Sequence, residues 1–205
     1  MKTYAEPSQT RIHFVRHGEV YNPRQILYAR TPRYRLNKRG LEESKLAAEF
    51  FKNHNIDMIY HSPMLRARQT ARFIAAHHKD VQMKESSLLN EIYTPYEGKP
   101  LVELEAIRWD IYSDIDSQYE QPDDILKRIK RFAQRVIREH LGREIVAITH
   151  GDIVVLVQIW GRALDPTYEN IRGLKPYPVT GSVSSLTFVG NESQPRFSYH
   201  QPGSE

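Results

Sequence analysis

Two stretches of this 205-residue chain place a histidine and a glycine directly after an apolar run. Residues 11–15 lead into Arg16-His17-Gly18, and residues 144–149 lead into His150-Gly151; an acidic residue follows the glycine in both places. Histidine can attack an electrophile, move a proton or donate a hydrogen bond. Glycine lets the backbone turn sharply and approach a ligand closely. The repeated pattern indicates that two strands deliver histidines to one site.

A third apolar run, residues 56–62, ends in Ser62-Pro63. Serine followed by proline is typical of a helix N-terminus, so we predict a helix with Ser62 as its N-cap and Arg66 one turn inside it. Ligands bind where the carboxyl ends of parallel strands meet helix N-termini, and free N–H groups there favour an anion. Two arginines and two histidines at such strand ends predict a phosphate site.

The elements that would position these residues alternate between strand and helix along the chain. Short β-branched or aromatic runs predict strands, and apolar residues every three or four positions predict helices. We expect strands at 11–15, 56–62 and 144–149, a closing antiparallel pair at 182–190 and 196–200, and helices at 37–54, 63–78, 121–142 and 152–161. This order predicts an α/β fold, a three-layer α/β/α sandwich with a mainly parallel sheet. Residues 94–120 have weak periodicity and are expected to form a partly helical excursion.

The composition, 40% hydrophobic and 26% charged, is that of a globular protein. The first residues lack the apolar core of a signal peptide, so we expect residues 1–10 to be a flexible tail and residues 11–205 a single domain. No apolar run approaches the ~20 residues of a membrane helix. The chain has no cysteine. This composition fits a reducing compartment, and we expect a cytoplasmic protein without membrane contact.

Positive charge is concentrated in the first 40 residues, although the net charge is only +4. Only Glu6 and Glu19 oppose nine basic residues there: Lys2, Arg11, Arg16, Arg24, Arg30, Arg33, Arg35, Lys38 and Arg39. The bias favours an anionic ligand. The predicted helix at 121–142 is also basic, through Lys127, Arg128, Lys130, Arg131, Arg135 and Arg138. Acidic residues interrupt it and no RNA-binding aromatic motif accompanies it, so we expect a solvated helix face and no nucleic-acid partner.

A metal site is the obvious alternative for the histidines. His13 and His17 have the spacing of a helical zinc pair, but on a strand four residues span ~13 Å, too far for one ion. His77 and His78 end a helix and point in different directions. The sequence predicts neither a metal ligand set nor another cofactor.

Five motifs together make the chain similar to the histidine phosphatase superfamily, in its phosphoglycerate mutase-like branch. They are "VRHGE" at 15–19, "LNKRG" at 36–40, "SPMLRARQTA" at 62–71, "LLNEIYTPYEG" at 88–98 and "THG" at 149–151. They follow the order found in that family and extend from Ile12 to about Val183. The resemblance implies the histidine phosphatase fold and a metal-free phosphoryl transfer through phosphohistidine.

The resemblance also implies roles for individual residues. His17 matches the nucleophile, and Arg16, Arg66 and His150 match the groups that hold the phosphoryl oxygens. Glu91 matches the acid that protonates the leaving group; without the family it would be a loop carboxylate. Two further residues are binding candidates. Asn22 lies three positions after Glu19 where the family asparagine lies four after, and Gly151 lets the backbone approach the ligand.

The sequence favours a phosphatase acting on a small phosphorylated metabolite. Only 58 residues separate Glu91 from His150, whereas mutases of this branch generally carry an additional segment there. A phosphoglycerate mutase-type transfer and a non-catalytic member that binds a phospho-ligand or a protein stay open, as do the substrate and the oligomeric state. The loop at 22–36, rich in arginine and tyrosine, and the segment at 93–120 are expected to select the substrate. The arginines of the loop at 22–36 suggest that the substrate carries a second anionic group, as in a sugar bisphosphate, a nucleotide or a phospho-acid.

Overall fold

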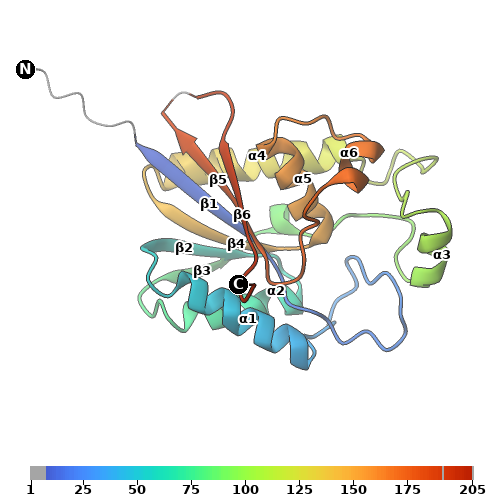
Figure 1. The fold of residues 1–205 in the computed structure, drawn as a ribbon, viewed down its shortest axis with the longest axis horizontal. Coiled ribbons are helices and arrows are strands. Elements are labelled where there is room, and N and C mark those ends of the chain that lie inside the picture. Colours follow the sequence, from blue (N-terminus) through green and yellow to red (C-terminus); the bar gives the residue numbers. More distant parts are fainter. Residues whose placement is uncertain (1–7, 191, 205) are drawn as a thin grey trace, which may run out of the picture.

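One six-stranded mixed sheet runs through the centre of the computed structural model, which describes residues 8–190 and 192–204 (Figure 1). The strands are β1 (Gln9–Arg16), β2 (Ile56–His61), β3 (Gln82–Glu85), β4 (Glu144–Thr149), β5 (Val183–Val189) and β6 (Arg196–His200). Their order is β3-β2-β4-β1-β5-β6; the first four are mutually parallel, whereas β5 and β6 add as antiparallel neighbours. The mainly parallel α/β sheet predicted from the sequence is confirmed, including the closing antiparallel pair.

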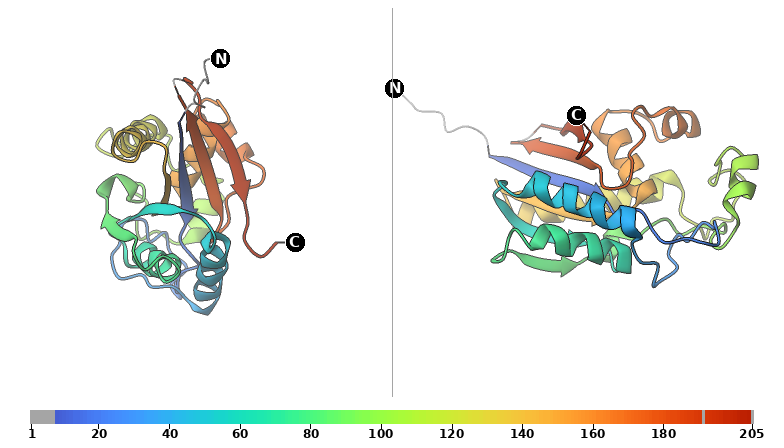
Figure 2. Two further views of the ribbon diagram at one scale, coloured as in Figure 1. Left: turned by 90° about the vertical axis from the view of Figure 1, so that its left-hand side faces the viewer. Right: turned by 60° about the horizontal axis from the view of Figure 1, so that its bottom comes forward.

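Helices cover both faces of this sheet. The helices are α1 (Lys38–Phe51), α2 (Leu65–Ala75), α3 (Leu101–Ala106), α4 (Pro122–Glu139), α5 (Gly151–Gly161) and α6 (Tyr168–Gly173), with a 3-10 turn, η1 (Ser87–Leu89). Of these, α3 lies away from the sheet, at the right-hand end in Figure 1. Alternate residues of β4 point to opposite faces: Ile145 and Ala147 pack with α4 and α5, and Val146 and Ile148 pack with α1 and α2. Figures 1 and 2 show the helices on either side of the strands. The three-layer sandwich is confirmed.

Local sequence signals predicted one helix start correctly and another wrongly. The Asn37 side chain accepts a hydrogen bond from the Gly40 N–H at 2.8 Å, so it is the N-cap of α1, which agrees with the start of the helix predicted at 37–54. The predicted Ser62 cap is wrong: α2 begins at Leu65, after an extended Met64. The Ser62 hydroxyl instead lies 2.7 Å from His150 Nε2. A long-range contact at the strand end has replaced the local cap.

The start of β1 differs from the sequence expectation, and strand β3 was not predicted. Strand β1 begins at Gln9, which pairs with Val189, so Gln9 and Thr10 belong to the sheet and not to the predicted tail. Residues 1–7 of that tail lie outside the described residues. The edge strand β3 has the sequence QMKE and is largely exposed, so it carries no apolar pattern from which it could be predicted.

Three segments that are distant in sequence gather at one end of the molecule. The loop after β1, the excursion that contains α3, and α6 all lie at the right-hand end in Figure 1, and Figure 2 shows the same grouping from another side. The excursion at 94–120 is partly helical, as predicted, because α3 occupies only Leu101–Ala106. Over the described ranges, no helix is long and apolar enough to cross a membrane.

Candidate active site

The sheet register brings the two histidines together. Strands β1 and β4 are parallel neighbours with Arg16 opposite Thr149, so each strand ends immediately before a histidine. The ring centroids of His17 and His150 are 5.1 Å apart. Ser62 follows β2 on the other side of β4, and its N–H donates to the Ile148 carbonyl. The sequence inference that these strand ends meet at one place is confirmed.

His17 is held in one orientation, and its Nε2 carries no proton. Its Nδ1 lies 2.8 Å from its neighbour's carbonyl oxygen, that of Gly18, which can only accept. The proton is therefore on Nδ1, and Nε2 accepts a hydrogen bond from Arg66 Nε at 3.1 Å. Burial, and then the Arg66 charge, lower the pKa of His17 well below its usual value. The imidazole is therefore neutral at physiological pH.

Gly18 is required by close backbone packing behind this histidine. A Cβ atom on Gly18 would lie 2.2 Å from the Gly40 carbonyl oxygen, and a Cβ on Gly40 would lie 2.0 Å from the Glu19 oxygen. Any side chain at either position would push the start of α1 away from the histidine loop. The conformational role expected for Gly18 fits this packing.

Three buried nitrogen atoms beside His17 have no hydrogen-bond partner among the described residues: Arg16 Nε, Arg66 Nη1 and His150 Nδ1. The rest of each side chain is fixed. Arg16 Nη1 donates to the Pro178 carbonyl at 2.7 Å, and Arg66 Nη2 donates to the Ala29 carbonyl at 2.6 Å. The Arg66 guanidinium also lies over the Tyr28 ring, 4.7 Å from its centroid. Anchored cations with unsatisfied donors suit a ligand with several acceptor oxygens.

His150 presents an unpartnered Nδ1 to the site. Its Nε2 lies 2.7 Å from Ser62 Oγ, and this hydroxyl also lies 3.3 Å from Asn90 Oδ1. When the hydroxyl donates to His150 Nε2, the neutral ring carries its proton on Nδ1, where it can donate to a ligand. Burial and the neighbouring Arg66 and His17 lower the pKa of His150 well below its usual value.

A network of ion pairs fixes the backbone that carries Glu91. Arg128 Nη1 donates to the carbonyls of Leu88 and Asn90 at 3.0 and 2.7 Å, and Arg30 Nε donates to the carbonyl of Glu91 at 2.7 Å. Both guanidinium groups also bind Glu120, at 2.8 to 2.9 Å. Arg128 is thus buried in this network. The solvated role predicted for it from the charge pattern of its helix is wrong.

The Glu91 carboxyl is poised to hold a proton near neutrality. Burial, and then the nearby Asp152 carboxylate, raise its pKa to about 7. Its Oε1 accepts a hydrogen bond from the Ile92 N–H at 3.0 Å. The hydroxyl of Tyr112 donates to Asp152 Oδ1 at 3.0 Å. Asp152 was not assigned a role from the sequence, although the repeated His-Gly-acid pattern was the signal that could have identified it.

A cavity of about 530 Å³ opens onto these groups. Arg16, Asn22, Glu91, Gly151 and Asp152 line it. His17, Arg66 and His150 are buried just behind this lining, next in the chain or hydrogen-bonded to its members. The volume falls within the ~300–1,000 Å³ range typical of small-ligand sites.

One known protein family matches most of this chain. The sequence model of the histidine phosphatase superfamily (branch 1) matches residues 12–198. The chain belongs to this superfamily. The resemblance read from its motifs is confirmed.

Individual relatives share less than a third of their residues with this chain over the aligned ranges. The chain is 29% identical to the uncharacterized protein Rv0525 of Mycobacterium tuberculosis over 151 residues, 70% of this chain and 74% of that one. It is 28% identical to phosphoglycerate mutase-like protein 4 of Arabidopsis thaliana over 152 residues, 68% of this chain and 66% of that one. The structure of mycobacterial glucosyl-3-phosphoglycerate phosphatase Rv2419c superimposes with a TM-score of 0.77 at 17% identity, over 96% of this chain and all of that one. At this identity the superposition establishes a shared fold.

Asn22, whose spacing departs from the superfamily pattern, lines the cavity, but its side chain hydrogen-bonds to the backbone of its own loop. Its Nδ2 donates to the Ile26 carbonyl at 2.8 Å, and its Oδ1 accepts from the Ile26 N–H at 3.3 Å. In this structure Asn22 shapes the loop. Gly151 lies against Arg16, where a Cβ would be 3.3 Å from the guanidinium carbon.

The arginines of the 22–36 loop do not line the cavity, although this loop was expected to select the substrate. Arg30 belongs to the Glu120 network, and Arg35 lies over the Tyr21 ring. Arg24 and Arg33 are exposed. Tyr28 is the member of the aromatic and basic set that faces the cavity.

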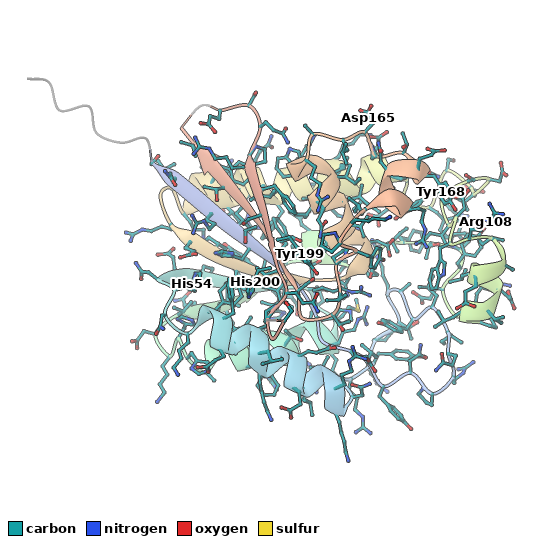
Figure 3. The ribbon with its side chains drawn as sticks, viewed as in Figure 1. His54, Arg108, Asp165, Tyr168, Tyr199 and His200 are labelled. Carbon is teal, nitrogen blue, oxygen red and sulfur yellow. The ribbon has the colours of Figure 1, made fainter. Side chains whose placement is uncertain are left out.

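At the opposite end of β1, the fold forms a cluster that the sequence did not predict: His13, His54 and Glu144, with ligand atoms within 4.8 Å of one another. Glu144 Oε1 lies 2.6 Å from His13 Nε2 and 2.8 Å from His54 Nδ1, so this carboxylate hydrogen-bonds to both histidines. His54 lies on the left in Figure 3, far from Arg108 and Tyr168 at the cavity end. The cluster is separate from the candidate active site.

Proposed function

We propose that the protein is a metal-independent phosphatase that hydrolyses phosphomonoesters of a small metabolite through a phosphohistidine on His17. One observation supports the proposal: the buried, neutral His17 has an unprotonated Nε2 beside three unpartnered nitrogen atoms, those of Arg16, Arg66 and His150. A phosphoryl group has three oxygens to accept from such donors and a phosphorus atom for the histidine to attack.

In the first step, His17 Nε2 forms a bond to phosphorus while the bond to the ester oxygen breaks. Negative charge on the phosphoryl oxygens is held by N–H groups of Arg16, Arg66 and His150. The Arg66 Nε–H now bonded to Nε2 must turn to a phosphoryl oxygen before the attack, because a lone pair cannot accept and attack together. Binding of the phosphoryl group therefore releases His17 Nε2 from its hydrogen bond to Arg66.

Glu91 moves the proton in both steps. Protonated Glu91 donates to the departing alkoxide, which leaves as the alcohol. The resulting carboxylate then takes a proton from water as the water oxygen bonds to phosphorus and the N–P bond breaks, releasing phosphate and regenerating His17. A pKa near 7 lets one carboxyl serve as acid and base in turn.

The short connection between Glu91 and His150 supports hydrolysis over a mutase reaction. The fold neighbour Rv2419c is a phosphatase by name, while the plant relative carries a mutase-like name. A mutase must hold the intermediate and exclude water, whereas this cavity adjoins exposed Tyr177 and Arg172. An open site gives water access to phosphohistidine.

The test is phosphate release from a panel of phosphomonoesters with EDTA present, with His17→Ala beside the wild type. We expect release by the wild type and a loss of at least about 10³-fold in the variant. His77→Ala, a surface histidine, is the matched control and should keep full activity. Quenched wild type incubated with ³²P-labelled substrate should carry acid-labile, base-stable label on His17. Full activity in His17→Ala would refute the mechanism, and phosphate binding without label or release would point to a binding role.

A further inference from the structure

The cavity has two chemically different ends. The charged residues Arg16, Glu91 and Asp152 lie at the end beside His17 and His150, and the fourth charged residue of the lining, Arg172, lies at the outer rim. Beyond them the lining is mainly apolar: Ile26, Leu27, Leu101, Trp109, Ile111, Val155, Ile171 and Leu174. Five of these eight side chains are at least nine-tenths buried in the core around the cavity. The apolar end is thus built as part of the fold.

Trp109 is held on this wall by an unusual backbone. Arg108 and Trp109 both have left-handed φ values, +52° and +61°, which L residues rarely adopt. The Trp109 N–H donates to the Leu104 carbonyl at 2.7 Å and the Arg108 N–H to that of Glu105 at 2.9 Å, closing the end of α3. Tyr168 of α6 donates to the Arg108 carbonyl at 2.9 Å, and Figure 3 shows these two residues side by side. Two separate elements thus hold the backbone that places Trp109 at the cavity.

Charge in the cavity disfavours a second anion close to the phosphoryl group. Asp152 and Glu91 are both carboxyls, and the loop arginines that suggested a bisphosphate face elsewhere. Arg172, at the outer rim, is the one cation besides Arg16 among the described lining residues, and Asp152 and Tyr177 lie near it. A ligand that fills the cavity beyond its phosphate meets hydrocarbon and aromatic rings.

We propose that the substrate is a phosphomonoester whose alcohol carries one flat, apolar body that packs against Trp109, Ile111 and Ile171, without a second phosphate. The inference rests on the proposed phosphatase function for its chemistry, but the binding preference stands on the cavity alone. A phosphoryl group fills only a small part of 530 Å³. An alcohol with an apolar surface would displace water from the remaining space and bury the apolar lining.

Binding can be measured without turnover by using phosphonates, whose C–P bond is not hydrolysed. Titration calorimetry would compare 3-phenylpropylphosphonate, ethylphosphonate and 2-carboxyethylphosphonate. Burying roughly 100 Å² of additional apolar surface should make the phenylpropyl compound bind roughly 50-fold tighter than the ethyl compound. The carboxyethyl compound should bind no better than the ethyl compound. Equal affinity for all three, or preference for the carboxylate, overturns the inference.

A variant locates the preference. Trp109→Ala should lose most of the phenylpropyl advantage while ethylphosphonate affinity stays within about twofold, because only the apolar wall is shortened. Trp160→Ala removes a partly buried tryptophan that does not line the cavity, and should keep the full preference. If Trp109→Ala fails to fold, the wild-type series still decides.

The matching esters, ethyl and 3-phenylpropyl phosphate, leave as similar primary alcohols, so their kcat/KM ratio reports the cavity and not the leaving group. We expect a ratio of roughly 50 in favour of the phenylpropyl ester. Hydrolysis of both at the same rate contradicts the substrate class and leaves the phosphatase function intact. Selective phosphonate binding without hydrolysis of either ester refutes the phosphatase function and leaves the cavity preference intact.

Discussion

At the scale of single residues, several groups of the candidate site lower the free energy of unfolding of the protein. Arg16 and Arg66 bring two cations together, three buried nitrogen atoms lack partners, and Glu91 and Asp152 place two carboxyls at one cavity. Each of these would destabilise an ordinary core. Such groups gather where a ligand or a proton completes them. Stability and function should therefore oppose each other at these positions.

Glu91→Gln tests this opposition. Because the pKa of Glu91 is raised from 4.5 to about 7, the folded state keeps a proton that the unfolded chain loses in that interval. The wild-type free energy of unfolding should therefore fall as pH rises from about 4.5 to 7, by on the order of 1–3 kcal/mol from this group. Glutamine cannot titrate, so urea unfolding should show the variant gaining that much over the wild type between pH 5 and pH 8, with phosphatase activity lost.

The matched control is Glu103→Gln, an exposed acid on α3. Its stability difference from the wild type should be the same at both pH values. Parallel pH profiles for Glu91→Gln and the wild type would mean that Glu91 titrates normally in the folded protein.

At the scale of elements, α4 carries a positioning function that its charge pattern does not reveal. Arg128 and Arg131 look alike in the sequence, yet Arg128 is buried against Glu120 and the backbone before Glu91, whereas Arg131 is exposed. The difference arises from the excursion at 94–120, which returns Glu120 to this face of the helix. Helix periodicity identifies the apolar stripe, but it cannot show which flanking cation receives a partner from a distant loop.

Arg128→Met should therefore disturb the site as well as the fold. Removing the guanidinium leaves Glu120 with Arg30 and the Tyr93 N–H and frees the carbonyls of Leu88 and Asn90, at a cost of about 2–4 kcal/mol in urea unfolding. We expect kcat to fall about tenfold or more with KM little changed, because Glu91 loses its fixed backbone. Arg131→Met should change neither. A stability loss with unchanged kcat would show that the network is structural only.

The sequence predicted much of the framework and the meeting of three strand ends for a physical reason, whereas Glu91 became a candidate only through the family resemblance. Buried strands and amphipathic helices have local patterns, and strand order then places His17, Ser62 and His150 at neighbouring ends. What local patterns could not supply were side-chain partners set by tertiary contact. Ser62 binds His150 instead of capping a helix, Asp152 lies beside Glu91, and the exposed strand β3 has no pattern at all.

At the scale of the whole molecule, the site joins parts of the chain that otherwise meet little. Two separate hydrophobic clusters hold the sheet to its helix layers, while the loop after β1, the excursion and α6 enclose the cavity from one end. Arg66 belongs to α2 on one face, and His150 is the N-cap of α5 on the other. A phosphate bound between them would contact both layers, so ligand binding should raise the stability of the entire fold.

Inorganic phosphate should thus raise the melting temperature in proportion to the logarithm of its concentration. At 100 times its Kd, the gain is about 2.7 kcal/mol, which corresponds to roughly 5–10 °C for a chain of this size. Sodium chloride at the same ionic strength should give no such shift, because chloride cannot satisfy several fixed donors at once. Arg66→Met fills a similar volume without the cation and should lose most of the phosphate response, whereas exposed Arg68→Met, on the same helix, should keep it. A full phosphate response in Arg66→Met would place the anion elsewhere on the protein and remove the basis for assigning the oxygen contacts to Arg66.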